Sequence, residues 1–134
     1  MSSTTSTSAY GITRTVSAGY DETVARVREL LKEEGFGVLT EIDVKRTLKE
    51  KLDQDVDPYV ILGACNPNFA ARSLRIEPDI GLLLPCNIIV ARRAGATHVG
   101  VVNPQSLVRI TSNAELAEIA NEVDARLRRV IEGL

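Results

Sequence analysis

The sequence lacks tryptophan, has a single histidine and two cysteines, and only 4% of its 134 residues are aromatic. A core made without large aromatic side chains must be built from Leu, Ile, Val and Ala. Two cysteines are too few for the disulfide framework of a small secreted protein. The segment from Met1 to Ser8 has neither the basic nor the apolar part of a secretory signal. We therefore expect a cytoplasmic protein with reduced thiols.

Long apolar runs and an excess of positive charge are missing as well. No run approaches the roughly 20 apolar residues that span a bilayer, so we expect no membrane contact. Sixteen basic and eighteen acidic residues give a net charge of −2, whereas a nucleic-acid-binding domain usually carries a basic patch. Residues 41–53 contain several Lys and Arg side chains, but acidic residues are interleaved with them, as on a solvated helix face. We therefore expect no nucleic-acid partner.

A chain of 134 residues has the length of one domain. Residues 1–9 are rich in Ser and Thr and have little to bury, which predicts a disordered tail. Residues 10–134 are expected to form a single α+β domain. Within it, the hydrophobic pattern predicts strands at residues 10–16, 36–42, 59–64 and 97–102. Helices are predicted at residues 21–34, at 44–52, from 66 to Pro78, and from Ser112 toward the C-terminus.

Several residues suit the ends of these helices. Asp21 and Asp43 are good N-caps, because a carboxylate accepts hydrogen bonds from unpaired first-turn N–H groups. Gly35 suits a left-handed C-terminal position, and Asn66 followed by proline is a helix start. Residues 112–115 match a capping box.

Two prolines predict interruptions in the chain. Residues 80–92 are expected to form one bent strand broken at Pro85-Cys86, or else two separate strands, because proline removes a ladder N–H. Asn103-Pro104 is expected to begin a loop.

Two arrangements fit this order of elements. Helix crossovers would produce a parallel, doubly wound sheet. Alternatively, the core order is β-α-β(4)-α, in which a mostly antiparallel sheet carries two long helices on one face and two short inserted helices. The helices that follow the second and third strands have about three turns or fewer, which is short for a full crossover. The second arrangement is therefore favoured.

The candidate functional site is a pair of turns in which cysteine is followed by asparagine: Cys65-Asn66 and Cys86-Asn87. Each turn interrupts an apolar stretch, and strand ends often carry binding residues. These four residues are our candidate ligand-binding residues. Each also has a purely structural interpretation. A free cysteine can be a small buried hydrophobe, Asn66 can cap a helix, and Asn87 can satisfy backbone groups left open by the proline before it.

The chemistry of these turns allows two hypotheses. The first is a dimeric, non-catalytic module that binds a small molecule or a partner near the two turns. The second is a thiol-dependent redox or metal-binding protein that uses Cys65 and Cys86. No motif identifies a reaction or a catalytic residue. Because His98 and the two cysteines lack the spacing of a zinc site, we expect no metal and no cofactor.

Four stretches together resemble the Domain of Unknown Function 302 family: residues 35–44, 47–51, 61–67 and 81–87. The resemblance runs in order from about Tyr10 to the last helix, and the two Cys-Asn turns are its most specific part. It implies a TATA-binding-protein-like β-α-β(4)-α fold and a homodimer. It implies no established activity, so it bears on the fold and not on the function.

Overall fold

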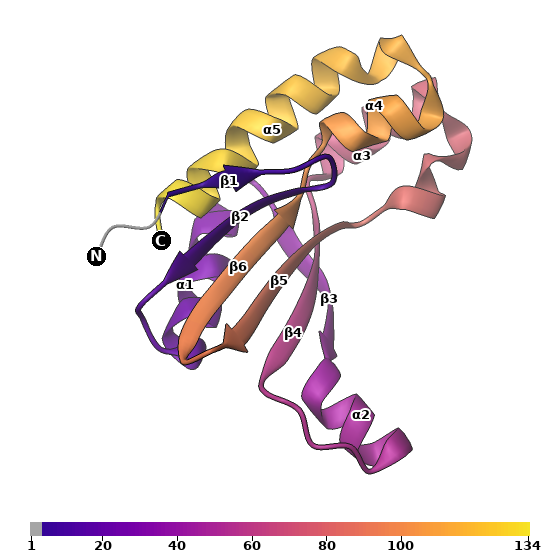
Figure 1. Cartoon of the computed structure of the whole chain (residues 1–134). Coiled ribbons are helices and arrows are strands. Elements are labelled where there is room, and N and C mark those ends of the chain that lie inside the picture. Colours follow the sequence, from indigo (N-terminus) through magenta and orange to yellow (C-terminus); the bar gives the residue numbers. More distant parts are fainter. Residues whose placement is uncertain (1–3) are drawn as a thin grey trace.

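The computed structural model describes residues 4–134, which form one six-stranded sheet with helices packed against it (Figure 1). Neighbouring strands follow the order β1-β2-β6-β5-β4-β3. The strands are β1 (Ser6–Thr7), β2 (Gly11–Val16), β3 (Gly37–Asp43), β4 (Tyr59–Cys65), β5 (Cys86–Arg93) and β6 (Ala96–Val102). The helices are α1 (Tyr20–Glu33), α2 (Val44–Leu52), α3 (Pro67–Ile76), α4 (Gln105–Thr111) and α5 (Ala117–Glu132). Two 3-10 helices are η1 (Pro78–Leu83) and η2 (Ala114–Leu116).

Every strand pairing among residues 4–134 is antiparallel. The expected α+β fold is therefore confirmed, with the chain order β2-α1-β3-β4-β5-β6-α5. The parallel, doubly wound alternative is wrong. Antiparallel neighbours need no helical crossover, so short connections such as the β5–β6 hairpin are sufficient.

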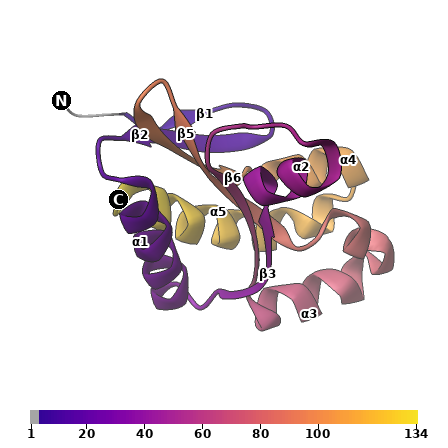
Figure 2. The same cartoon turned by 90° about the horizontal axis from the view of Figure 1, so that it is seen from below.

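The core lies between the sheet and the two long helices, α1 and α5, which lie on the same side of it (Figure 2). Val27 and Leu31 of α1 and Leu127 and Ile131 of α5 recur at helical spacing, and all four are completely buried. They belong to the same cluster as Ile88 of β5. Burial of each such side chain contributes roughly 1.5–3 kcal/mol, which makes this layer the main source of stability.

The two ends of the sheet differ in how they are covered. Helices α3 and α4 and the η1 segment gather at the end where β4 stops and β5 begins, whereas α2 projects from the opposite end (Figure 1). None of the nine residues of α2 is buried. The edge strand β3 is also exposed along nearly its whole length. The α3 and α4 end of the sheet is therefore where an enclosed site can form.

The N-terminal segment is more ordered than its composition predicts. Ser6 and Thr7 form β1, which pairs with β2, and the Ser8 side chain accepts a hydrogen bond from the Gly11 N–H at 3.0 Å. Arg128 of α5 also donates a hydrogen bond to the Thr7 hydroxyl. The expectation of a disordered tail is therefore wrong for this part of residues 1–9, because strand pairing supplies hydrogen bonds that composition does not reveal. Residues 1–3 lie outside the described part of the chain.

The apolar run at residues 80–84 is not a strand. Residues Pro78–Leu83 form the 3-10 helix η1, and β5 begins only at Cys86. Both versions of the expected strand are therefore wrong for this segment. The physical reason is the position of its side chains. Ile80 is buried against α3 and α4 instead of in the sheet, while Leu82 is 86% exposed.

Three helix ends agree with the sequence. Asp43 accepts a hydrogen bond from the Arg46 N–H, Asn66 caps α3, and Gly35 has the positive φ of 83° expected after α1.

Two predicted helix starts and one predicted loop are wrong. Helix α1 begins at Tyr20, so Asp21 lies inside its first turn. Asn113, and not Ser112, caps the segment before α5 by accepting from the Glu115 N–H. Asn103-Pro104 begins the helix α4 and not a loop.

Candidate functional site

The two Cys-Asn turns lie side by side at one end of the sheet. Cys65 is the last residue of β4 and Cys86 is the first residue of β5, and Cys86 pairs with Ala64 across the two strands. The chain between the two cysteines forms α3 and η1 and then returns to the sheet at β5. The antiparallel pairing of β4 and β5 thus brings the two turns together. The sequence alone did not predict that they are neighbours.

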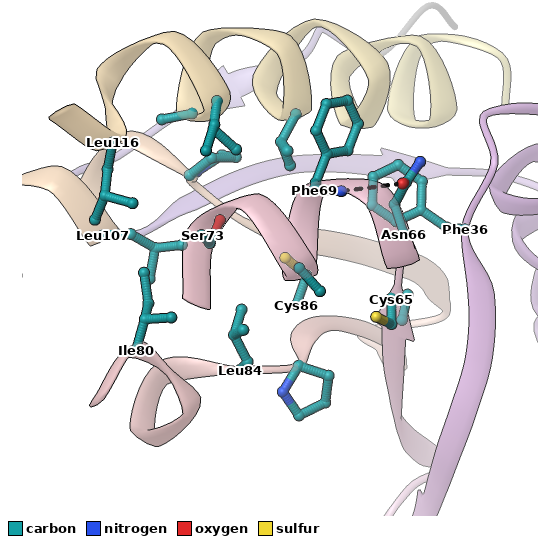
Figure 3. Close-up of a pocket in the computed structure, with 17 residues that line it drawn as sticks. Phe36, Cys65, Asn66, Phe69, Ser73, Ile80, Leu84, Cys86, Leu107 and Leu116 are labelled. Atoms are coloured by element: carbon teal, nitrogen blue, oxygen red, sulfur yellow. Dashed lines mark hydrogen bonds between the residues drawn. The ribbon is translucent and has the colours of Figure 1, made fainter. Parts of the chain in front are cut away.

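A cavity of about 60 Å³ lies beside these turns. Its walls come from α3, η1, α4, η2 and α5 and from the ends of β4 and β5, as Figure 3 shows for the labelled side chains. The lining residues are Phe36, Ala64, Cys65, Asn66, Phe69, Ala70, Ser73, Ile80, Leu84, Pro85, Cys86, Pro104, Leu107, Leu116, Ile119, Ala120 and Val123. None of them is charged, so the site favours an apolar occupant.

Asn66 positions the helix that forms one wall. Its side-chain oxygen accepts hydrogen bonds from the N–H groups of Asn68 and Phe69, at 3.1 and 3.4 Å. Its amide nitrogen lies next to Gly35, where an added Cβ would come within 2.9 Å. The oxygen is therefore used in capping, which supports the structural interpretation of this residue.

The two cysteines differ in exposure. Cys86 is 9% exposed and belongs to the core cluster, whereas Cys65 is half-buried. Burial raises the pKa of the Cys86 thiol to about 11, and the neighbouring Cys65 adds to the increase. A buried thiol with a raised pKa stays protonated at neutral pH and is a poor nucleophile and a poor metal ligand.

Asn87 does not line the cavity. It is exposed, and it pairs with Gly63 on the face of the sheet opposite to that of Cys86. Successive residues of a strand point to opposite faces, so Cys86 and Asn87 cannot both face the same site. The Asn87 side chain has no hydrogen-bond partner among residues 4–134, so it does not satisfy the backbone near Pro85 either.

One polar side chain in the cavity wall was not predicted. Ser73 of α3 is 8% exposed, and its hydroxyl has no hydrogen-bond partner among residues 4–134. Figure 3 places this hydroxyl among the cavity side chains. It lies seven residues after Asn66, which is two helical turns along the same face. That spacing was the signal in the sequence that could have identified it.

The missed wall residues come mainly from α3 and α5, with single residues from η1, α4 and η2. Leu107 of α4 lines the cavity because α4 packs against α5. The same Asn-Pro pair that starts α3 also starts α4, and the Asn103 side chain accepts a hydrogen bond from the Gln105 N–H. Recognition of that repeated pair would have predicted the helix.

Other kinds of site find no support in the described chain. Residues 4–134 contain no group of three or more His, Cys, Asp or Glu side chains that could hold a metal ion. His98 lies in β6 beside the Thr15 hydroxyl, and burial followed by the nearby Arg93 lowers its pKa. Among the same residues there is no helix with the length and apolar character needed to cross a membrane.

Comparison with known proteins gives matches over most of the chain. Residues 12–134 match the family model described as domain of unknown function DUF302. A protein of Aquifex aeolicus (strain VF5) described as uncharacterized is 33% identical over 99 residues, which is 64% of this chain and 68% of that protein. A crystal structure of an uncharacterized conserved DUF302 protein from Bacillus stearothermophilus superposes with a TM-score of 0.87 at 38% identity, covering 93% of this chain and 98% of that one.

Proposed function

The chain belongs to the DUF302 family, and we propose that it is a binding module for a small molecule, held in the apolar cavity beside the two Cys-Asn turns. The observation that carries this proposal is the cavity itself. It contains three of the four candidate residues, Cys65, Asn66 and Cys86, in a wall without charge. Protein interiors leave few voids larger than a water molecule, and an apolar pocket with a few polar groups is where a small-molecule ligand is expected to bind.

The size and polarity of the cavity limit what it can hold. One water-sized group needs roughly 10–15 Å³, so a cavity of about 60 Å³ accommodates about four to six such groups. Apolar cavities of this kind stay dry and bind apolar gases or small organic molecules. The occupant is therefore smaller than a typical cofactor.

The test uses ligand-induced chemical shifts and thermal shifts with xenon and a panel of small apolar molecules. A ligand at one hundred times its Kd stabilises the folded protein by about 2.7 kcal/mol. Ala70 lines the cavity, whereas Ala71 is exposed on the same helix. We expect Ala70→Leu to fill the cavity and abolish binding, and Ala71→Leu to leave binding unchanged. Equal binding by both variants would place the ligand elsewhere and refute the proposal.

The alternative function is thiol chemistry at Cys65 and Cys86, which would require an accessible thiolate. The raised pKa of Cys86 argues against it, because at pH 8 only about one molecule in a thousand would carry the thiolate. We expect iodoacetamide to modify Cys86 at pH 8 at least about one hundred times more slowly in the folded than in the unfolded protein. The measurement is made in the Cys65→Ser variant by mass spectrometry. Fast modification of folded Cys86 would restore the alternative.

We also propose that the protein is a homodimer, as the family resemblance implies, and that β3 and α2 form the interface. Leu39 and Ile42 of β3 and Leu52 of α2 are 69%, 50% and 61% exposed. Exposed apolar side chains on an edge strand favour association. Lys49 of α2 pairs with Asp53 and Asp55 within the chain, so the proposed interface rests on the apolar side chains of this patch.

Light scattering after size-exclusion chromatography tests the dimer. We expect a mass of twice the 14.6 kDa chain for the unmodified protein, and a monomer when Leu39 and Ile42 are both replaced by Lys. Ile110→Lys is the matched control, because Ile110 is 65% exposed but lies on α4. A monomeric unmodified protein, or a dimer that survives the double substitution, would contradict this interface.

A further inference from the structure

Ser73 is the feature of the cavity that folding does not explain. A buried hydroxyl without a hydrogen-bond partner usually costs about 1–3 kcal/mol, so such groups are rare in folded proteins. Ser73 is more than nine-tenths buried, and its hydroxyl has no partner among residues 4–134. No side-chain nitrogen or oxygen of the described residues is both sealed from solvent and unpaired. The Ser73 hydroxyl therefore keeps some accessible surface, and that surface opens into the cavity it lines (Figure 3).

The other amide or hydroxyl side chain of the wall, Asn66, does not bind the same ligand as Ser73. The Asn66 side-chain oxygen is used in capping α3. Asn66 and Ser73 are two turns apart, or about 10 Å along the helix axis. A molecule of four to six heavy atoms is too short to reach both. The wall around Ser73 is formed by aliphatic side chains, including Ile80, Leu107 and Leu116, which are labelled near it in Figure 3.

We propose that the cavity binds a short, uncharged alcohol or carbonyl compound whose oxygen hydrogen-bonds to the Ser73 hydroxyl and whose alkyl part fills the apolar wall. This inference rests on the proposed function and adds the chemical class of the ligand. A hydroxyl both donates and accepts, so Ser73 pairs with either an alcohol or a carbonyl oxygen. The ligand is uncharged because no lining residue could pair with a charge, and an unpaired charge is strongly disfavoured in an apolar site.

The experiment measures the Kd of xenon, 1-pentanol and pentanoate from methyl chemical shifts of the full chain. Xenon reports the cavity alone, 1-pentanol adds one hydroxyl, and pentanoate adds a charge at similar length. We expect Ser73→Ala to weaken 1-pentanol binding about five- to tenfold and to leave xenon binding unchanged, because only the alcohol uses the hydrogen bond. We expect pentanoate to bind at least ten times more weakly than 1-pentanol to the unmodified protein.

Ser106→Ala is the matched control. Ser106 is also a buried serine, but its hydroxyl donates to the Asn103 carbonyl at 2.7 Å and it does not line the cavity. We expect this control to lower the melting temperature and to leave all three Kd values unchanged. Ser73→Ala removes an unpaired hydroxyl, so it should leave the melting temperature unchanged or raise it.

The outcomes separate the two proposals. If xenon binds and 1-pentanol binds equally well to the Ser73→Ala variant, the role of Ser73 is refuted and the cavity proposal stands. Pentanoate binding as tight as 1-pentanol binding refutes the requirement for an uncharged ligand. If neither xenon nor 1-pentanol binds the unmodified protein, the binding function itself is refuted.

Discussion

The two Cys-Asn turns have the same dipeptide and opposite environments. At the first turn the chain leaves the sheet, so Asn66 is free to face the helix that follows and to cap it. At the second turn the chain enters the sheet, so strand alternation buries Cys86 and exposes Asn87. A repeated dipeptide is therefore not a repeated site. Whether the strand ends or begins there decides which side chain faces the cavity.

The largest expected effect concerns the close approach of the two turns at Gly63. Gly63 precedes the first turn, and a Cβ added to it would lie 2.7 Å from Cγ of Pro85, which precedes the second, and closer still to the Thr40 hydroxyl. We expect Gly63→Ala to lower the free energy of unfolding by about 3 kcal/mol, because neither neighbour can move without disturbing its strand or turn. Urea unfolding measures the change.

The control for this substitution is Gly81→Ala, since an added Cβ at Gly81 meets nothing within 4 Å. We expect that variant to be as stable as the unmodified protein or slightly more stable. A loss of less than about 0.5 kcal/mol in Gly63→Ala would show that the two turns are not tightly packed against each other.

The next effect is the pH dependence of the free energy of unfolding, which we expect to come from the Cys86 thiol. The folded-state pKa of Cys86, about 11, lies above its ordinary value of 9.0, so the folded state retains this proton to higher pH. Its contribution to stability is complete below pH 9 and is lost as pH rises to about 11, at up to roughly 1.4 kcal/mol per pH unit. Urea unfolding between pH 8 and pH 11 measures this decrease.

Substitution of each cysteine in turn shows which thiol causes the decrease in stability at high pH. Burial also raises the pKa of Tyr20, which adds a decrease of the same sign. We therefore expect Cys86→Ala to reduce the slope and Cys65→Ala to retain most of it. An unchanged slope in Cys86→Ala would mean that its thiol is less buried than described.

The smallest effect compares the two asparagines. Asn66→Ala removes the cap of α3 and should cost about 1 kcal/mol. Asn87→Ala changes an exposed side chain without a partner among residues 4–134, so it should stay within about 0.5 kcal/mol of the unmodified protein. Thermal and urea unfolding of both variants provide the comparison. Equal losses would show that Asn87 has a structural role after all.

The order of strands and long helices could be predicted because it depends on local patterns. The apolar spacing in α1 and α5 and the caps at Asp43 and Asn66 act within a few residues. The strand predicted at residues 80–84 was wrong for the same reason, because that prediction also relied on local pattern alone. Residues 80–84 are as apolar as a strand, but residues 80–83 belong to the 3-10 helix η1, which packs against α3. Local pattern does not reveal what a segment packs against.

The candidate site was predicted only in part for a related reason. Cys65, Asn66 and Cys86 lie in the cavity wall, but the remaining wall residues come from elements far apart in the sequence. Leu107 and Leu116 reach the site only because α4 and η2 pack beside α3 and α5. Asn87 was predicted as a site residue because Cys86-Asn87 repeats the dipeptide Cys65-Asn66. The alternation of side chains along β5 places it on the face of the sheet away from the cavity. That these residues bind a ligand remains a prediction.

The position of β2 in the sheet has a consequence for folding. β2 pairs with β6, the strand made last, and the paired residues Gly11 and Val102 are 91 positions apart. During synthesis β2 can form only its short pairing with β1 until β6 has left the ribosome. Closing so long a loop slows folding. We therefore expect folding in milliseconds to seconds, with the edge of β2 available to chaperones until then.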